Sequence, residues 1–281
     1  MTHSSPILRF AVIGNPISHS KSPAIHRAFA KQTGIELSYE RIEAPLDQFA
    51  QTVSDFFAAG GKGLNVTVPF KLQAWQLAAH LTQRASEAEA VNTLWIKDGA
   101  LHGCNTDGVG LVSDLRRLNI KLDGARVLLV GAGGAARGVI GPLLDTGCAS
   151  LRVVNRTKEK ALELVSSGQS AGRSQLSAGG LSDARQDGGW DLVINASASS
   201  LGDAPPDLPQ GLYAPGAWAY DMMYGPKPTP FMLQAQRDGA SGIADGLGML
   251  VGQAAESFFI WHGVRPDVAP VLSGLRNDMQ A

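Results

Sequence analysis

Short apolar runs alternate with helix-like stretches through the first hundred residues. Three of the runs have the length of a strand, at residues 9–13, 37–42 and 64–68. Between the first two, residues 22–33 repeat apolar positions at helical spacing, with Ile25, Ala28 and Phe29 on one face. The first run stops at Gly14-Asn15-Pro16, which is a turn signal. This alternation of strands with helices predicts an α/β domain.

A tight hairpin is predicted at the end of this region. Two apolar runs, residues 94–96 and 100–102, flank Lys97-Asp98-Gly99. An Asp-Gly pair between such runs favours a two-residue turn whose residues adopt positive φ angles. We therefore expect two antiparallel strands here, joined by this turn.

A second alternating pattern begins near Leu111. Residues 126–130 form an apolar run of the kind expected for a strand buried on both faces of a parallel sheet. Further strand candidates are residues 151–155, 192–195 and 218–221. Helical spacing is found after the 126–130 run, at residues 158–165 and at residues 249–261. The Ser/Gly-rich residues 166–189 predict a surface loop with little regular structure.

Composition narrows the class of protein without assigning a function. The 281 residues are enough for one or two domains, and 44% hydrophobic with 17% charged residues is typical of a globular protein. The formal net charge of -1 gives no general attraction to nucleic acid or to an anionic membrane. No apolar run reaches the roughly 18 residues of a membrane span, and the polar first residues do not resemble a signal peptide. We expect a cytoplasmic protein.

Cysteine and histidine usage predicts no metal site. Cys104 and Cys148 lack the spacing of a metal site or a disulfide framework, so we expect two reduced thiols. The six histidines include no HExxH pair and no cluster with the cysteines.

A glycine-rich turn follows the 126–130 run and precedes a helical stretch, with the sequence Gly131-Ala132-Gly133-Gly134-Ala135-Ala136. Gly131 allows a tight turn, and Gly133 lets the backbone approach a pyrophosphate. The helix start then offers free N–H groups to the phosphates. Glycines alone could form a purely structural turn, but the strand before them and the helix after them favour dinucleotide binding.

The end of the next strand indicates which dinucleotide binds. NAD-binding folds usually carry an Asp or Glu about 20 residues after the glycines, where it holds the ribose hydroxyls. This chain has Asn155-Arg156-Thr157 instead, with Lys160 one helical turn later. The Arg156 guanidinium can pair with a 2′-phosphate, although a solvated basic helix start would look the same. The pattern favours NADP as the cofactor.

Ordered motifs elsewhere in the chain resemble the shikimate dehydrogenase family. The amino-terminal motifs are Asn15 through Pro23, Gly63 through Lys71, Ala90-Val91-Asn92-Thr93 and Asn105-Thr106-Asp107-Gly108. The later motifs are Asn155-Arg156-Thr157, Asp221 through Thr229, and Asp245 through Gln253. Any one of them would be weak evidence, but in this order over nearly the whole chain they are specific.

The resemblance implies an α/β protein of two domains. Residues 1–107 would form an α/β substrate-binding domain, and residues 108–245 a Rossmann-type doubly wound NADP-binding domain. Residues 246–281 would be C-terminal helices that pack back on the substrate domain. The substrate would bind in the cleft between the domains, a usual place for ligands.

The resemblance also implies roles for individual residues. Lys71 and Asp107 match the catalytic pair. Ser20, Ser22 and Tyr224 match the residues that hold the substrate carboxylate, whereas the ring hydroxyls would be bound by Asn65, Thr67, Lys71, Asn92, Asp107 and Gln253. The nicotinamide would lie beside Ser197, Met222 and Gly246, and the rest of NADP would be bound by Gly131, Ala132, Gly133, Gly134, Ala135, Asn155, Arg156, Thr157 and Lys160.

Several of these side chains also have an ordinary structural explanation. Ser20 and Ser22 could simply cap the helix that follows them. Asn65 and Thr67, as alternate positions of one strand, share a face that could be plain surface. A single lysine such as Lys71 is usually solvated. It is the ordered set of motifs that favours the functional roles.

The chain departs from the family pattern at a few positions. Glu89 stands where many members carry Gly, Cys104 lies where the family varies, and Ser197 replaces a frequent Thr. None of these removes a catalytic group. The Glu89 change could alter the loop that carries Asn92.

The implied reaction is the reversible, NADPH-dependent reduction of 3-dehydroshikimate to shikimate in aromatic amino-acid biosynthesis. Lys71 would act as the acid–base group, with Asp107 orienting the hydroxyl. The implied partners are the small-molecule substrate and NADP, with no nucleic acid and no membrane, in a monomer or homodimer. Two alternatives remain open: a quinate/shikimate dehydrogenase, with NAD as a conceivable cofactor, and a non-catalytic sensor that binds NADP or shikimate.

Overall fold

The structure is a computed structural model that describes residues 7–166, 173–197 and 204–280. The described chain divides into two compact units. Unit 1 contains the residues up to Thr106 together with Gln253–Val271, and unit 2 contains Asp107–Gly252 and the residues from Leu272 onward. No helix among the described residues is long and apolar enough to cross a membrane.

Unit 1 is built on a mixed six-stranded sheet with the strand order β2-β1-β3-β5-β6-β4. Its strands are β1 (Leu8–Gly14), β2 (Leu37–Glu43), β3 (Gly63–Val66), β4 (His80–Leu81), β5 (Thr93–Lys97) and β6 (Ala100–Cys104). β1 pairs in parallel with β2 and β3, whereas β5 runs antiparallel to β3 and β6. The predicted hairpin at Asp98-Gly99 is confirmed, since both residues have positive φ between β5 and β6.

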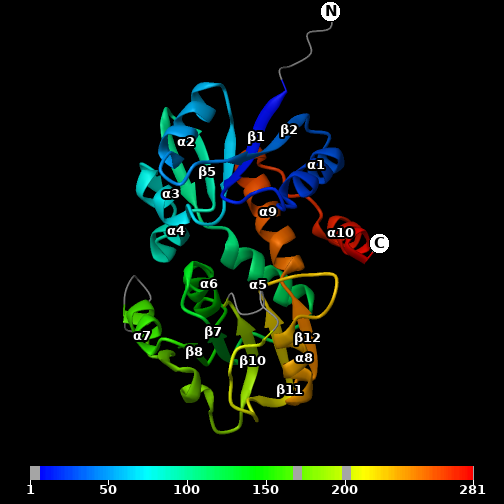
Figure 1. The fold of residues 1–281 in the computed structure, drawn as a ribbon. Helices are drawn as coiled ribbons and strands as arrows, with labels where there is room; N and C mark the ends of the chain where they lie inside the picture. Colours follow the sequence, from blue (N-terminus) through cyan, green and yellow to red (C-terminus); the bar gives the residue numbers. More distant parts are fainter. Residues whose placement is uncertain (1–6, 167–172, 198–203, 281) are drawn as a thin grey trace, which may run out of the picture. The chain divides into compact units, whose positions relative to one another are not determined.

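Helices cover both faces of this sheet, as Figure 1 shows. They are α1 (Ser22–Thr33), α2 (Phe49–Ala58), α3 (Lys71–Leu77), α4 (Gln83–Ala88) and the part of α9 (Leu247–His262) that belongs to unit 1. Alternate side chains of β1 pack on opposite faces of the sheet, because successive strand side chains point to opposite sides. Ala11 and Ile13 pack with α2 and α3, whereas Phe10 packs against Trp261 of α9.

A fully buried histidine lies between α1 and the sheet. The His26 ring stacks on Tyr39 with centroids 4.3 Å apart and also lies near Phe29, Phe258 and Trp261. Burial is the main reason that the pKa of His26 falls from 6.5 to about 3; the nearby His262 lowers this pKa further, and Asn65 partly offsets the shift.

This burial predicts acid sensitivity of the fold. As the pH falls below 6.5, the unfolded chain protonates His26 before the folded chain does, so His26 makes the free energy of unfolding decrease between pH 6.5 and about pH 3. The full effect is on the order of 5 kcal/mol. We expect His26→Leu to flatten this pH dependence, measured by denaturant unfolding at several pH values. His80→Leu at an exposed position is the control, and an unchanged slope in His26→Leu would contradict the expectation.

Unit 2 is built on a six-stranded sheet in which all described pairs are parallel, with the order β12-β11-β10-β7-β8-β9. Its strands are β7 (Arg126–Val130), β8 (Ser150–Asn155), β9 (Leu176–Gly180), β10 (Trp190–Asn195), β11 (Tyr213–Asp221) and β12 (Gly242–Asp245). The chain runs outward from β7 in one direction and then from β10 in the other. Such a reversal creates the switch point at which doubly wound sheets bind dinucleotides.

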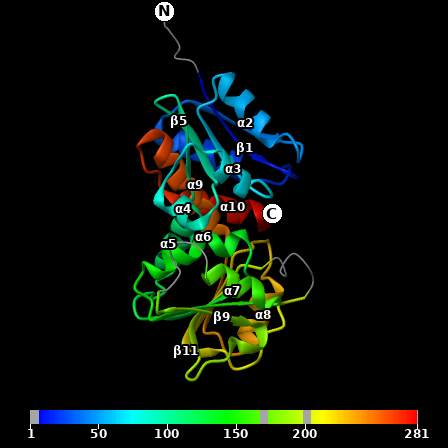
Figure 2. The same ribbon diagram turned by 90° about the vertical axis from the view of Figure 1, so that its left-hand side faces the viewer.

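Two hydrophobic cores flank this second sheet. α5 (Asp107–Arg117), α6 (Gly134–Leu144) and α7 (Lys158–Ser166) pack on one face, and α7 lies beside β9 in Figure 2. α8 (Pro230–Arg237) packs on the other face, where it buries Phe231. The last helix is α10 (Val268–Gln280), which belongs to unit 2 from Leu272 onward.

Two details of the sequence interpretation are wrong. The third strand ends at Val66 and not at residue 68, because Pro69 has no N–H for the ladder and Phe70 N–H instead closes a turn onto Thr67. The Ser/Gly-rich residues 166–189 are not all loop, since they contain β9 and a short 3-10 helix at Leu181–Ala184. Backbone pairing with β8 holds β9 in the sheet, although its sequence, Leu-Ser-Ala-Gly-Gly, has low strand propensity.

Candidate active site

Two serines lie at the start of α1 in unit 1. The Ser22 backbone N–H donates to Ser20 Oγ over 3.3 Å, and Ser20 Oγ in turn donates to Ser22 Oγ over 3.2 Å. The N-cap position of α1 belongs to Lys21, which makes no side-chain capping bond. Arg41 on β2 holds this turn, because its Nε and Nη2 donate to the Ser20 carbonyl oxygen at 3.0 and 2.6 Å. The structure therefore places two hydroxyls side by side on a turn that an arginine holds in position.

The Asn65 amide is held by hydrogen bonds on both of its ends. It lies on β3 and is 5% exposed. Tyr39 Oη donates to Asn65 Oδ1 over 2.7 Å, while Asn65 Nδ2 donates to Ser257 Oγ at 3.0 Å and to the Asn92 carbonyl oxygen at 3.1 Å. A carbonyl oxygen has two lone pairs, so Oδ1 keeps capacity for one more donor such as a ligand hydroxyl.

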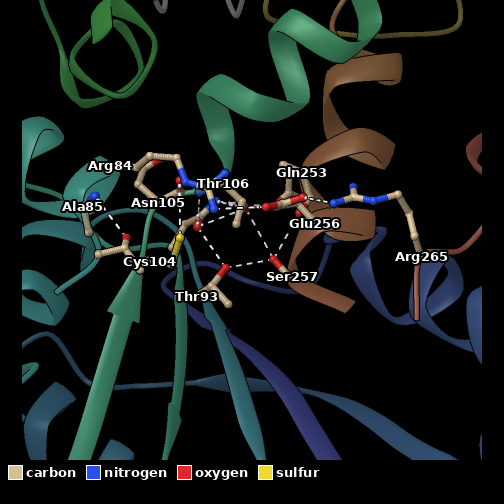
Figure 3. A network of polar contacts seen from close by, with 12 residues as sticks. Arg84, Ala85, Thr93, Cys104, Asn105, Thr106, Gln253, Glu256, Ser257 and Arg265 are labelled. Atoms are coloured by element: carbon tan, nitrogen blue, oxygen red, sulfur yellow. Dashed lines mark hydrogen bonds and ion pairs between the residues drawn. The ribbon is translucent and has the colours of Figure 1, made fainter. Parts of the chain in front are cut away.

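The Asn92 side chain, on the loop before β5, is hydrogen-bonded to Thr106, the residue before α5. Asn92 Oδ1 accepts from the Thr106 N–H at 2.9 Å, and Asn92 Nδ2 donates to Thr106 Oγ1 at 2.9 Å. Gln253 Oε1 lies 3.4 Å from both Asn92 Nδ2 and Thr106 Oγ1. Figure 3 shows Thr106 and Gln253 facing each other in this network. These contacts bring together two of the predicted ligand-binding amides.

The predicted catalytic residues occupy two helix starts. Lys71 is the first residue of α3, and its carbonyl oxygen accepts from the Val91 N–H at 2.9 Å, which places its backbone beside the Asn92 loop. Asp107 is the first residue of α5, is 7% exposed, and directly follows Thr106. Thr67 directly follows β3 and is half-buried, and its N–H still donates to the Ile13 carbonyl oxygen of β1 at 2.9 Å.

Glu89, which stands where many family members carry Gly, has a backbone conformation that favours glycine. It ends α4 with φ 46° and ψ 36°, which is the left-handed conformation that glycine adopts without steric cost. A non-glycine residue is strained there by about 1 kcal/mol. The following loop keeps its contact, since the Val91 N–H still reaches Lys71.

The glycine-rich turn in unit 2 has the geometry of a phosphate cradle. Gly131 has φ 114°, and a Cβ there would lie 3.0 Å from the backbone of Ser197. Gly133 is the N-cap of α6, and Gly134 is the first residue of this helix. A Cβ on Gly133 or Gly134 would meet no atom within 4 Å, so the backbone there borders open space that a pyrophosphate can approach. Ala132 lies in the same turn, and Ala135 is the second residue of α6.

A basic group follows β8, next to this cradle. Asn155 Nδ2 donates to the Thr157 carbonyl oxygen over 2.9 Å, which shapes the turn between β8 and α7. Arg156 and Lys160 are exposed there. Arg156 makes no hydrogen bond or ion pair with another residue that the structure describes. Lys158, in contrast, is paired with Asp183 at 3.1 Å. The Arg156 guanidinium is therefore exposed at this turn with no partner among the described residues.

Asn195 joins the carboxyl ends of β10 and β11. Its Oδ1 accepts from Ser197 Oγ at 2.7 Å, its Nδ2 donates to Asp221 Oδ1 at 3.2 Å, and its carbonyl oxygen accepts from the Met222 N–H at 2.9 Å. Gly246 lies against this group, because a Cβ on it would collide with the Met222 carbonyl oxygen. Ser197, Met222 and Gly246, predicted to line the nicotinamide, are thus gathered at one edge of the sheet.

Tyr224 follows on the same loop and remains a neutral phenol. Burial, with a further contribution from Asp245, raises the pKa of Tyr224 above its usual value. Arg276 on α10 joins this loop to the end of β12, donating to the Gly225 carbonyl oxygen at 3.2 Å and to Asp245 Oδ2 at 2.8 Å. Neither arginine contact of the site, from Arg41 or from Arg276, had a signal in the sequence.

The sequence interpretation assigned no role to several side chains that hold the site together. They are Tyr39, Arg41, Thr93, Thr106, Asp221, Ser257 and Arg276. Most of them touch a predicted site residue that is distant in sequence. Ser257 had one usable signal, since it lies one helical turn after Gln253 on α9.

Three family descriptions match the chain in order. They are the shikimate dehydrogenase substrate binding domain at residues 12–94, the shikimate / quinate 5-dehydrogenase at residues 114–200, and the shikimate 5′-dehydrogenase C-terminal domain at residues 246–273.

Curated relatives match over the full length. The shikimate dehydrogenase (NADP(+)) of Bordetella petrii is 61% identical, and that of Bordetella avium is 62% identical; each alignment covers 100% of this chain and 99% of the relative.

Solved structures match as well. An Ael1 enzyme from Pseudomonas putida is 43% identical with a TM-score of 0.88, covering 95% of this chain and 98% of that one. The shikimate 5-dehydrogenase of Thermus thermophilus, solved in complex with NADP(H) and shikimate, is 33% identical with a TM-score of 0.86, covering 96% of this chain and 99% of that one.

Proposed function

Because the chain belongs to the shikimate dehydrogenase family, we propose that it catalyses the reversible, NADPH-dependent reduction of 3-dehydroshikimate to shikimate. The observation that carries this proposal is the presence of both halves of the required site. Unit 1 holds a buried cluster of amides and hydroxyls suited to a polyol, and unit 2 holds the glycine-rich cradle with an exposed arginine beside it.

We assign substrate binding mainly to residues of unit 1, with Asp107 and Tyr224 of unit 2 added, and NADP binding to unit 2. The carboxylate of the substrate would accept hydrogen bonds from the paired hydroxyls of Ser20 and Ser22 and from the neutral phenol of Tyr224. The ring hydroxyls would be bound by Asn65, Thr67, Lys71, Asn92, Asp107 and Gln253. Asn65 would accept a hydrogen bond from a ring hydroxyl through Oδ1, because its Nδ2 already donates within the protein.

The cofactor fits the residues that unit 2 presents. Its pyrophosphate would lie against the turn formed by residues 131–135, where the free N–H groups of α6 begin. The 2′-phosphate would pair with Arg156, and Asn155, Thr157 and Lys160 would complete that side. Ser197, Met222 and Gly246 would line the nicotinamide. NADPH, when bound, supplies the hydride for the reduction.

The acid–base step falls to Lys71 in this proposal. In the reductive direction negative charge would build on the carbonyl oxygen of the substrate, and Lys71 Nζ would donate a proton to that oxygen. In the oxidative direction Lys71 accepts the hydroxyl proton. Asp107 would orient the reacting hydroxyl and stabilise the cationic form of Lys71. General acid–base catalysis of this kind contributes about 10²–10⁴-fold.

The substrate of the enzyme can be tested directly in solution. We expect the purified protein to reduce NADP⁺ when shikimate is added, followed by the near-ultraviolet absorbance of NADPH. Quinate in place of shikimate, and NAD⁺ in place of NADP⁺, should each give a much lower kcat/KM. A preference for quinate with NAD⁺ would instead indicate a quinate/shikimate dehydrogenase, and binding of both ligands without turnover would indicate a sensor.

We further propose a cytoplasmic location and action as a monomer or homodimer. Both cysteines are free and buried, and burial raises the pKa of the Cys104 and Cys148 thiols. Unpaired thiols are usual in the reducing cytosol. Sedimentation of the purified protein would decide between the two assembly states.

A further inference from the structure

The Ser257 hydroxyl is a hub of the polar network in unit 1. Ser257 is fully buried on α9. Its Oγ accepts from Asn65 Nδ2 at 3.0 Å, lies 2.8 Å from Thr93 Oγ1 and 3.3 Å from Thr106 Oγ1, and donates to the Gln253 carbonyl oxygen at 3.0 Å. Figure 3 shows Ser257 facing Thr93 with Thr106 above them. A hydroxyl offers one donor and two acceptor lone pairs, so these contacts use the full hydrogen-bonding capacity of the Ser257 hydroxyl.

Each partner of Ser257 belongs to a different segment of the proposed substrate site. Asn65 is itself a proposed ligand-binding residue, Thr93 directly follows Asn92, and Thr106 directly precedes Asp107. The fourth partner is the backbone of Gln253. One buried hydroxyl therefore touches, or lies one residue from, four groups that the proposed function assigns to substrate.

We propose that Ser257 is a positioning residue, which sets the orientation of the Asn65 amide and of the Thr106 segment toward the substrate. This inference rests on the proposed function, since the residues that Ser257 orients are the ones assigned to shikimate. Ser257 does not touch the reacting atoms in this view and acts only through its neighbours.

Backbone pairing shows why Ser257 is proposed to orient side chains and not to hold the sheet together. Asn65 and Thr93 are already aligned as partners in the β3–β5 ladder, whose register does not depend on Ser257. What the ladder leaves undetermined is the rotation of the side chains. The amide of Asn65 and the hydroxyls of Thr93 and Thr106 take their orientation from the acceptors around them, and Ser257 Oγ is the acceptor or donor common to all three.

A neighbouring anchor keeps α9 in place without this hydroxyl. Glu256, with 9% of its side chain exposed, accepts from Arg84 at 3.0 Å and from Arg265 at 2.9 Å. Figure 3 shows Glu256 between these two arginines. Because a buried carboxylate with two guanidinium partners is costly to separate, the helix should remain docked in a Ser257→Ala variant.

The test compares Ser257→Ala with the wild-type protein in steady-state kinetics and thermal unfolding. We expect kcat/KM for shikimate to fall by about 10-fold or more, as expected for loss of more than one buried hydrogen bond, with a higher KM and a lower kcat. The KM for NADP should stay within about twofold, because NADP binding is assigned to unit 2. Thr93→Val, which removes a partner hydroxyl, should give a smaller loss in the same direction.

A matched control removes a hydroxyl that has only a helical partner. Thr33 Oγ1 donates to the Phe29 carbonyl oxygen at 2.9 Å, as Ser257 does to Gln253, but has no contact with the network. Thr33→Val should leave both constants unchanged. The double variant Ser257→Ala/Thr93→Val should lose less than the product of the two single effects, because both changes act on one network.

Wild-type constants in folded Ser257→Ala would overturn the inference, even if its Tm were lower, because that result would indicate a purely structural role. If Ser257→Ala does not fold, Thr93→Val decides, and wild-type constants there overturn the inference as well. Absence of turnover in the wild type would be a failure of the proposed function. Shikimate binding measured by calorimetry then tests positioning alone: weaker binding by Ser257→Ala supports it, and equal or undetectable binding by both proteins overturns it.

Discussion

Replacing Lys71 with methionine should lower kcat by about 10²–10⁴-fold while shikimate and NADP still bind. Methionine keeps most of the volume of the lysine stem and removes the amine that would transfer the proton. Lys71 is half-buried at the start of α3, and its backbone is fixed to the Asn92 loop through Val91, so its side chain starts from a defined place. The fold should therefore survive the change, and the loss should be specific to the proton transfer.

The split between kcat and KM decides the role of Lys71. If Lys71 only bound a ring hydroxyl, the KM for shikimate would rise while kcat held. If it is the acid–base group, kcat falls and the dissociation constants measured by fluorescence titration change little. Lys62→Met, at an exposed lysine before β3, is a control that should retain full activity. A near-normal kcat in Lys71→Met would rule out the mechanism proposed for this enzyme.

Replacing Arg156 with alanine should change the choice of cofactor. Only NADP has the 2′-phosphate, and a hydrogen bond to a charged group contributes about 1.5–3 kcal/mol. We therefore expect the KM for NADP to rise by about 10–150-fold, with little change in the KM for NAD. Arg156 is exposed and makes no ion pair with another residue described in the structure, so its removal should not disturb the fold.

The control for this change is an arginine on the same unit that has no proposed ligand. Arg173 pairs with Asp145 at 3.0 Å, and Arg173→Ala should leave both cofactor constants unchanged. Kinetics with each cofactor at low and at high salt complete the measurement, because an exposed ionic contact is screened by salt. Equal losses for NADP and NAD in Arg156→Ala would show that Arg156 does not discriminate between them.

Local sequence was sufficient for the elements whose pattern is strong. The helix at residues 22–33 and the 126–130 strand were predicted with their observed bounds, and the Asp98-Gly99 turn forms as expected. In each case the signal is local: apolar periodicity, a continuous buried run, or a dipeptide that tolerates positive φ. The glycine-rich turn belongs to the same class, because its strand and helix flank it directly in the sequence.

The features that the sequence did not predict depend on contacts between segments that are distant along the chain. β9 has weak strand residues and exists because β8 offers it a partner, which no local pattern reveals. The contact of Tyr39 with Asn65 and that of Ser257 with Thr93 depend on how β2, β3, β5 and α9 assemble. Ser, Thr and Tyr are also common residues throughout the chain. A hydroxyl that orients a distant amide therefore leaves no mark in a single sequence.

The contact between Thr106 and Gln253 has a consequence for how a two-segment domain can fold around an inserted one. These residues are the last and first of the two segments of unit 1, yet Thr106 Oγ1 and Gln253 Oε1 lie 3.4 Å apart. Within unit 2, α5 and α9 also approach closely, since a Cβ on Gly252 would lie 3.1 Å from the Gly110 carbonyl oxygen. Neighbouring chain ends are the geometry that lets one domain be inserted into another. Once unit 2 has folded, it holds the end of the first segment of unit 1 close to the start of the second segment. The two segments can then pair without the closure of a long disordered loop.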